Sequence, residues 1–159
     1  MRRSHVHLLA LYARLTRLPA GRWLFSRAVC LKAPYFASIA PRVDALEAGH
    51  CVVSFAHRRR VTNHLGTVHA IALCNAAELA AGLATEAGVP PSMRWIPRGM
   101  CVDYLHKASG RMRATARAAA SVGDGQAREV PVDVEITDPR GTVVFRARVA
   151  MWVSPRPQR

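Results

Sequence analysis

The chain has 159 residues, half of them hydrophobic, and a formal net charge of +13 at pH 7. This length suits one domain with a substantial core, and the apolar content excludes a chain that is disordered throughout. The charge favours anionic partners such as nucleic acid, anionic lipid or a phosphorylated small molecule, although codon composition would produce the same bias. It is uneven, because residues 1–60 hold eleven Lys and Arg against two acids.

The sequence contains four widely spaced cysteines, Cys30, Cys51, Cys74 and Cys101. No Cys-x-x-Cys or Cys/His ligand spacing occurs, so a structural zinc site is not expected. Four free thiols favour a reducing compartment, and no apolar run reaches the length of a transmembrane helix. We therefore expect a cytoplasmic protein with no bound metal and no transmembrane segment.

The first 48 residues are predicted to be mainly helical. Leucines recur at helical spacing over residues 5–18, and a second helix is expected over about residues 22–31. Pro34 and Pro41 then mark irregular connections. A basic amphipathic helix of this kind could lie on a membrane surface, but packing on its own domain or on a partner subunit is the commoner role. We expect residues 1–48 to form a helical extension packed on the core.

Residues 49–154 carry a different pattern. Residues 50–56 resemble a strand, and an alanine-rich helix is expected from about Ala70 to Gly88. Four strand-like runs follow, over residues 92–105, 111–118, 130–137 and 143–153. Pro97-Arg98-Gly99 interrupts the first of them and predicts a bulge, bend or edge. Consecutive strands without intervening helices predict an antiparallel meander and the α+β class, and residues 155–159 are expected to be a tail.

One carboxylate stands alone in the alanine-rich run that extends to about Gly82. Glu78 follows His69 by nine residues, about two and a half helical turns, in a run made mostly of Ala and Leu. Burying such a carboxylate is costly unless it has a partner or a function. Glu78 is therefore the first candidate for a functional residue.

The residues around this helix carry a resemblance to a known superfamily. Asn63-x-x-Gly66-x-x-His69-Ala70, with Glu78 nine residues after His69, resembles the Asn-x-x-Gly-x-x-His-Gly-Gly…Asp/Glu signature of hotdog-fold acyl-CoA thioesterases. The order of strand, central helix and four antiparallel strands is also that of the hotdog fold, in which the sheet wraps around the helix. The chain looks most like the branch of this superfamily with extra N-terminal helices and no assigned function.

This resemblance implies a thioester hydrolase that needs no metal. Glu78 would activate water as a general base, or act as the nucleophile. Asn63 would bind the thioester carbonyl or orient the water, and the Ala70 N–H would be an oxyanion donor. Gly66 and His69 complete the motif. Because hotdog sites commonly lie between subunits, the resemblance also implies a homodimer, or dimers paired into a tetramer.

The motif departs from the family at Ala70 and Ile71, where two glycines are usual. Alanine keeps the backbone donor, since only proline removes it, but the added side chains narrow the approach of a thioester. Three functions therefore stay open: hydrolysis of an acyl-CoA or acyl-carrier thioester, non-catalytic binding of acyl groups or CoA, and a hotdog dehydratase.

Structural roles also stay open for the same residues. Asn63 and Gly66 could be ordinary turn residues. His69 could be a core or capping histidine, and Glu78 could pair with an arginine.

Coenzyme A, as part of the substrate and not as a cofactor, would explain some of the basic character. Its phosphates suit arginine side chains, and the candidates are Arg58, Arg59, Arg60, Arg98, Arg111 and Arg113. Nucleic acid is not the expected partner, because aromatic residues make up only 6% of the chain and are not interleaved with the arginine clusters.

Overall fold

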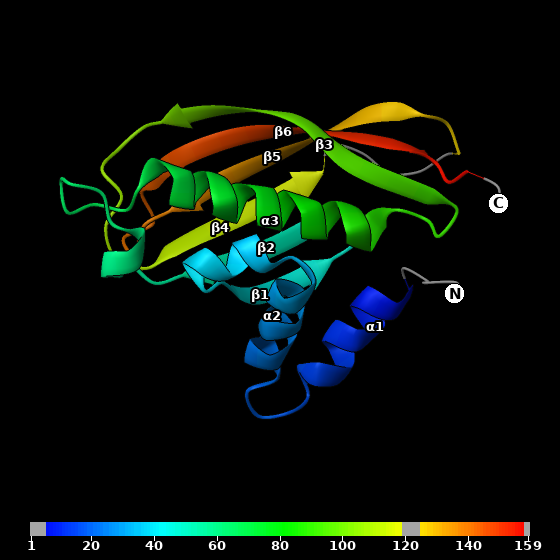
Figure 1. The fold of residues 1–159 in the computed structure, drawn as a ribbon, viewed down its shortest axis with the longest axis horizontal. Helices are drawn as coiled ribbons and strands as arrows, with labels where there is room; N and C mark the ends of the chain where they lie inside the picture. Colours follow the sequence, from blue (N-terminus) through cyan, green and yellow to red (C-terminus); the bar gives the residue numbers. More distant parts are fainter. Residues whose placement is uncertain (1–5, 119–124, 158–159) are drawn as a thin grey trace.

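The computed structural model describes residues 6–118 and 125–157, with the side chains described from residue 8 onward. A six-stranded antiparallel sheet curves around one long helix, α3 (Ala70–Gly88), and two further helices project away from the sheet (Figure 1). The predicted α+β class, with an antiparallel sheet wrapped around a central helix, is confirmed. The predicted loop near residues 121–125 lies almost wholly outside the described residues.

The strands are β1 (Arg42–Glu47), β2 (His50–Phe55), β3 (Met93–Tyr104), β4 (Met112–Ala118), β5 (Arg128–Thr137) and β6 (Val143–Pro155). Their order across the sheet is β1-β2-β4-β5-β6-β3. The sequence predicted all of them except β1, which lies in a segment expected to be helical or irregular. β1 pairs with β2 through a tight turn in which Gly49 has φ +74°, a conformation that suits glycine.

The prediction of a four-strand meander was wrong for β3. Only β4, β5 and β6 are consecutive neighbours, whereas β3 pairs with β6 and forms an edge of the sheet. The place beside β4 is taken by β2, and the chain leaving α3 joins the sheet at the far edge, beside β6. The predicted irregularity is confirmed, because the register of β3 shifts between Pro97 and Gly99.

The helix α3 fills the concave side of the sheet. Its small side chains, mostly alanine, allow the strands to approach closely, and the largest buried side chains that meet it include Phe55, Phe145, Met112 and Ile136. Gly82 serves a specific purpose: a Cβ there would lie 3.0 Å from the indole ring of Trp95, which packs on the helix. The indole Nε1 in turn donates a 2.5 Å hydrogen bond to the carboxylate of Glu86.

The N-terminal helices α1 (Val6–Leu15) and α2 (Gly21–Lys32) confirm the predicted helical segments. The 3-10 helix η1 (Pro34–Ile39) follows them, where the sequence had indicated an irregular connection. Tyr12 meets Phe25 edge to face at 5.0 Å, and its hydroxyl donates to the Asp44 carbonyl at 2.8 Å. The Val43 N–H donates to the Ser26 hydroxyl at 2.8 Å. These contacts tie the helices to β1. A domain boundary near residue 48 stays a prediction.

Candidate functional site

The turn that leads into α3 uses the side chain of Asn63 for its own structure. The Asn63 Oδ1 accepts hydrogen bonds from the N–H groups of Leu65 (3.0 Å) and Thr67 (3.1 Å), and its Nδ2 donates to the Thr67 hydroxyl at 2.9 Å. Gly66 closes the turn with φ +75°. Asn63 and Gly66 therefore hold the loop in shape, which is the structural role that the sequence had left open.

His69 occupies the N-cap position of α3. Its Nδ1 accepts a hydrogen bond from the Ile71 N–H at 3.1 Å, so the imidazole caps the helix. The N–H of Ala70, in contrast, has no hydrogen-bond partner in the described part of the chain. Such an N–H at a helix N-terminus adds to the positive end of the helix dipole. Backbone N–H groups of this kind are the donors that oxyanion holes use.

Glu78 lies on the one side of α3 that the fold leaves uncovered. Most residues of α3 are buried, whereas Glu78 and Ile71 are exposed and Cys74 is half-buried. These three positions share one helical face. Glu78 makes no hydrogen bond or ion pair with the described residues. Glu78 is thus an exposed carboxylate with apolar neighbours and not a buried one, as the composition of the segment had suggested.

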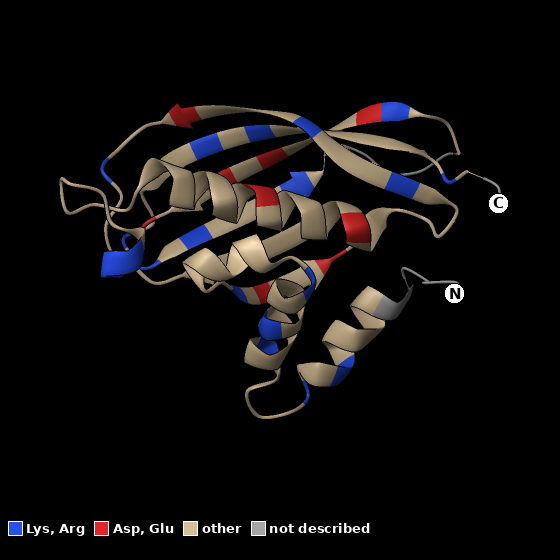
Figure 2. Ribbon diagram, viewed as in Figure 1, with Lys and Arg blue, Asp and Glu red and all other residues tan. Residues whose placement is uncertain are grey.

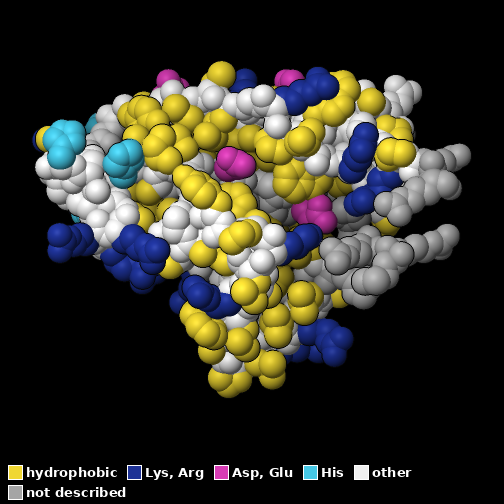
Figure 3. Space-filling view, in the orientation of Figure 1, with side chains coloured by type: hydrophobic (Ala, Val, Ile, Leu, Met, Phe, Trp, Pro, Cys, Tyr) yellow, Lys and Arg dark blue, Asp and Glu magenta, His cyan; other side chains and the backbone are white. Residues whose placement is uncertain are grey.

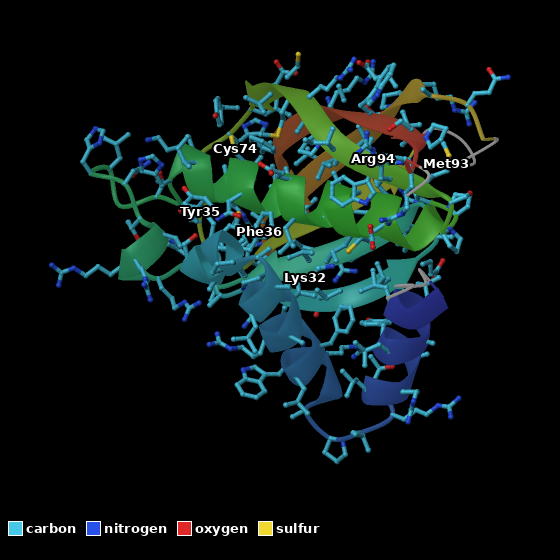
Figure 4. All side chains as sticks on the ribbon, turned by 45° about the vertical axis from the view of Figure 1, so that its right-hand side comes forward. Lys32, Tyr35, Phe36, Cys74, Met93 and Arg94 are labelled. Atoms are coloured by element: carbon cyan, nitrogen blue, oxygen red, sulfur yellow. The ribbon has the colours of Figure 1, made fainter. Side chains whose placement is uncertain are left out.

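The surroundings of this face are apolar. Figure 3 shows hydrophobic side chains gathered over α3 and β3, with carboxylates set among them, and β3 contributes the exposed side chain of Tyr104. The Cys74 Sγ lies 3.4 Å from the Tyr104 hydroxyl, and this hydrogen bond is the main cause of a raised Tyr104 pKa. Figure 4 shows Cys74 at the same end of the molecule as Tyr35 and Phe36 of η1.

One buried polar residue beside Glu78 was not among the predicted functional residues. Asn75 is 6% exposed, and its Nδ2 donates to the Ser38 hydroxyl of η1 at 2.9 Å. Its Oδ1 is buried without a hydrogen-bond partner among the described residues, which costs about 1–3 kcal/mol. Asn75 precedes Glu78 by three residues, so their side chains are neighbours on the helix. The signal available in the sequence was a single amide in an alanine-rich run.

The six arginines proposed for coenzyme A do not lie together. Arg58, Arg59 and Arg60 lie at and just before η2 (Arg59–Val61), next to the turn that leads into α3, and all three are exposed. The others are exposed elsewhere: Arg98 lies 3.8 Å from the ring centre of Trp152, Arg113 pairs with Asp44 at 3.8 Å, and Arg111 precedes β4.

Exposed basic and acidic residues alternate with buried ones along β5 and β6, so they lie on the outer face of the sheet; Figure 2 colours their positions. Across β5 and β6, Arg146 pairs with Glu135 at 2.9 Å and Arg148 with Asp133 at 2.7 Å. Arg98 and Arg113 belong to this outer face, because the buried side chains of their strands point toward α3. The structure therefore groups Arg58, Arg59 and Arg60 next to the turn before α3, and Arg111 adjoins Gly110, which contacts His57 just before them.

No cluster of three or more His, Cys, Asp or Glu residues suited to a metal ion occurs among the described residues. All four cysteines are free. Within residues 6–118 and 125–157, no helix is long and apolar enough to cross a membrane. The cytoplasmic location stays a prediction.

The antiparallel sheet wrapped around α3 defines a hotdog-fold protein. The chain belongs to the DUF4442 family, described as a domain of unknown function, whose family model matches residues 21–153. A crystal structure described only as the genomics target APC5556 is 44% identical, with a TM-score of 0.80, over 95% of this chain and 99% of that one.

Other similar structures carry functional names. PA5026 from Pseudomonas aeruginosa, a protein of unknown function and probable thioesterase, is 22% identical with a TM-score of 0.75, over 87% of this chain and 97% of that one. The thioesterase HI1161 from Haemophilus influenzae is 14% identical with a TM-score of 0.68, over 76% and 82% of the two chains. At these identities the likeness shows a shared fold. A comparison with functionally curated proteins finds no match.

Proposed function

We propose that this protein hydrolyses an acyl-CoA or acyl-carrier thioester, with Glu78 as the base that activates water. The observation that carries the proposal is the placement of Glu78, an unpaired carboxylate on the one open face of a helix whose first N–H is also open. The names of the structures HI1161 and PA5026 support the same reaction class.

The chemistry uses groups of this chain alone. Glu78 takes a proton from water as the water oxygen bonds to the thioester carbonyl carbon. The carbonyl oxygen becomes an oxyanion, and the Ala70 N–H at the positive end of α3 stabilises it. When the tetrahedral intermediate collapses, the carbon–sulfur bond breaks and the proton held by Glu78 passes to the leaving thiolate. The products are a carboxylic acid and a free thiol.

The distance between Ala70 and Glu78 favours a site shared by two copies of the chain. Glu78 lies eight residues after Ala70, about 12 Å further along the helix axis. A reacting carbonyl oxygen and its attacking water each need a partner within about 3 Å. We therefore assign Ala70 and Glu78 of one site to different subunits of a homodimer, in which the edge strand β3 supplies unpaired backbone groups for contact. Pairing of dimers into a tetramer stays a prediction.

Asn63 receives a different role in this scheme from the one that the resemblance implied. Because its amide is bonded within the turn, Asn63 positions the loop that presents Ala70 and does not contact the thioester. Arg58, Arg59 and Arg60, exposed beside the same turn, are the best-placed candidates for the phosphates of coenzyme A.

Non-catalytic binding of acyl groups or CoA is the second candidate function. The observation in its favour is Ile71, whose side chain is 54% exposed immediately after the proposed oxyanion donor. A bulky group at this position restricts how closely a thioester approaches the helix. Such a protein would gain thermal stability from acyl-CoA without releasing free thiol.

A panel of short, long and aromatic acyl-CoAs, assayed with a thiol reagent, tests the main proposal. The substitution Glu78→Gln should lower kcat at least about 100-fold, because the amide cannot accept the proton. The matched control is Glu86→Gln, which removes the other carboxylate of α3 and should leave kcat within about threefold. Turnover by Glu78→Gln equal to that of the wild-type chain would contradict the proposal.

A further inference from the structure

The hairpin formed by α1 and α2 is anchored to the rest of the molecule by one side of each helix. The contacts of Tyr12, Phe25 and Ser26 fix the helices to β1. Both helices run outward to the turn at residues 16–20, which projects from the body of the molecule (Figure 1). The end of the hairpin is therefore a protrusion and does not form part of the core.

The tip of the hairpin has a defined backbone. The Leu18 N–H donates to the Leu15 carbonyl at 2.9 Å, and the Gly21 N–H donates to the Leu18 carbonyl at 3.0 Å. A Cβ at Gly21 would lie 1.6 Å from the Leu15 carbonyl oxygen, so only glycine allows the helices to meet this closely. Leu18 is consequently held on the outside of an ordered turn, with an exposed fraction of 55%.

The hairpin carries a second apolar surface that its own packing does not use. The side chains that pack on the core are Leu8, Leu9, Tyr12 and Leu15. A different set is exposed: Leu11 44%, Leu18 55%, Trp23 58%, Leu24 42% and Leu31 84%. Figure 3 shows hydrophobic side chains gathered over the protruding end of the hairpin, with basic side chains beside them.

The charges of the hairpin all have one sign. The chain has no acidic residue before Asp44, whereas the two helices and the turn between them carry five exposed cations: Arg14, Arg17, Arg22, Arg27 and Lys32. None of these five cations forms an ion pair with a described residue. Apolar side chains including a tryptophan, surrounded by unpaired cations, are typical of segments that enter the interface of an anionic bilayer.

We propose that the tip of this hairpin binds the surface of an anionic lipid bilayer. Leu18, Trp23 and Leu24 enter the headgroup region, and the surrounding arginines contact lipid phosphates. A second copy of the chain fits the surface less well, because a twofold contact at the tip would bring Arg17 and Arg22 close to their own copies without an acid between them. The inference does not depend on the proposed thioesterase activity, since it uses no residue of that site.

Sedimentation of the full chain with vesicles tests this inference. We expect binding at least tenfold tighter to vesicles with one-third phosphatidylglycerol than to pure phosphatidylcholine, and loss of the difference at high salt. The double substitution Leu18→Ser/Trp23→Ser should weaken binding at least tenfold, and Arg17→Gln/Arg22→Gln should remove most of the preference for anionic lipid. The exposed controls Leu65→Ser and Lys107→Gln should bind like the wild-type chain.

Two results would overturn the inference. One is that the wild-type chain does not bind vesicles, or that it binds them and Leu18→Ser/Trp23→Ser binds equally well. The other is a smaller oligomer in gel filtration for the same double variant with vesicle binding intact, which would make the tip a contact between copies. Circular dichroism should show an unchanged fold, because all four substituted side chains are exposed.

Discussion

Individual buried polar residues differ in whether their environment stabilises the fold. Asn75 keeps a buried acceptor without a partner, although alanine would fit the surrounding helix. Ser26 is a buried polar residue whose hydroxyl is fully bonded. It accepts a hydrogen bond from the Val43 N–H and donates one to the Arg22 carbonyl oxygen. Buried polar groups that add little stability are often kept for function. The position of Asn75 beside Glu78 suggests that its amide serves the proposed site.

The substitution Asn75→Ala should separate stability from function. We expect a free energy of unfolding within about 1 kcal/mol of the wild-type value, because the substitution removes an unpartnered acceptor along with one hydrogen bond. We expect kcat for the best thioester to fall at least about tenfold. The control Ser26→Ala should cost about 1–3 kcal/mol, since it leaves the Val43 N–H unpaired, and should retain kcat. Urea unfolding and the thiol assay measure both quantities, and an Asn75→Ala variant with full activity would refute this role.

At the scale of single residues, the sequence predicted which residues lie around the start of α3 better than it predicted what their side chains do. The alanine-rich composition and the helical periodicity predicted that a helix begins near Ala70 and carries Glu78. The hydrogen bonds that occupy Asn63 and His69 were not readable, because turn residues and ligand-binding residues share the same amino-acid types. The exposure of Glu78 depends on which face of α3 the sheet covers, and this is a tertiary property.

At the scale of elements, the hairpin between β5 and β6 has a defined electrostatic support. The Asp138 carboxylate accepts hydrogen bonds from the N–H groups of Arg140 (2.9 Å) and Thr142 (3.0 Å) and pairs with the Arg140 guanidinium at 3.2 Å. Burial raises the pKa of Asp138, but these hydrogen bonds and the guanidinium outweigh it, so the pKa lies below its ordinary value.

This lowered pKa has a defined sign for stability. The contribution of Asp138 is fully present above the unfolded-state pKa, about 3.9, and is lost as pH falls through the lower folded-state pKa. In the variant Asp138→Asn, the free energy of unfolding should therefore fall less steeply with decreasing pH below about pH 4. Urea unfolding at several pH values checks this. An identical change of the free energy of unfolding with pH in the variant and the wild-type chain would contradict it.

The sequence pattern predicted most of the strands but not how all of them pair. Alternation of apolar and polar residues identified β3 to β6, because each has one face on the core. It missed β1, a six-residue strand that follows a proline and contains Asp44, and so resembles a connection. It also placed β3 beside the wrong strand, because alternation reports that a strand exists and not which strand it pairs with.

For the whole molecule, the account requires two copies. A single chain leaves the α3 face around Glu78 uncovered and places Ala70 too far from Glu78 along the helix to serve one carbonyl. Light scattering should give a mass of at least two chains at micromolar concentration. A stable monomer with full activity would show that one subunit forms the site alone.

Mixing two inactive variants tests the central claim most directly. Ala70→Pro removes the oxyanion donor at a helix position where proline is tolerated, and Glu78→Gln removes the base. In a mixed dimer one of the two sites combines an intact Ala70 from one subunit with an intact Glu78 from the other. After random exchange, half of the dimers are mixed, so the account predicts recovery of about a quarter of the wild-type activity. Mixed dimers that form, as shown by native mass spectrometry, and yet remain inactive would contradict it.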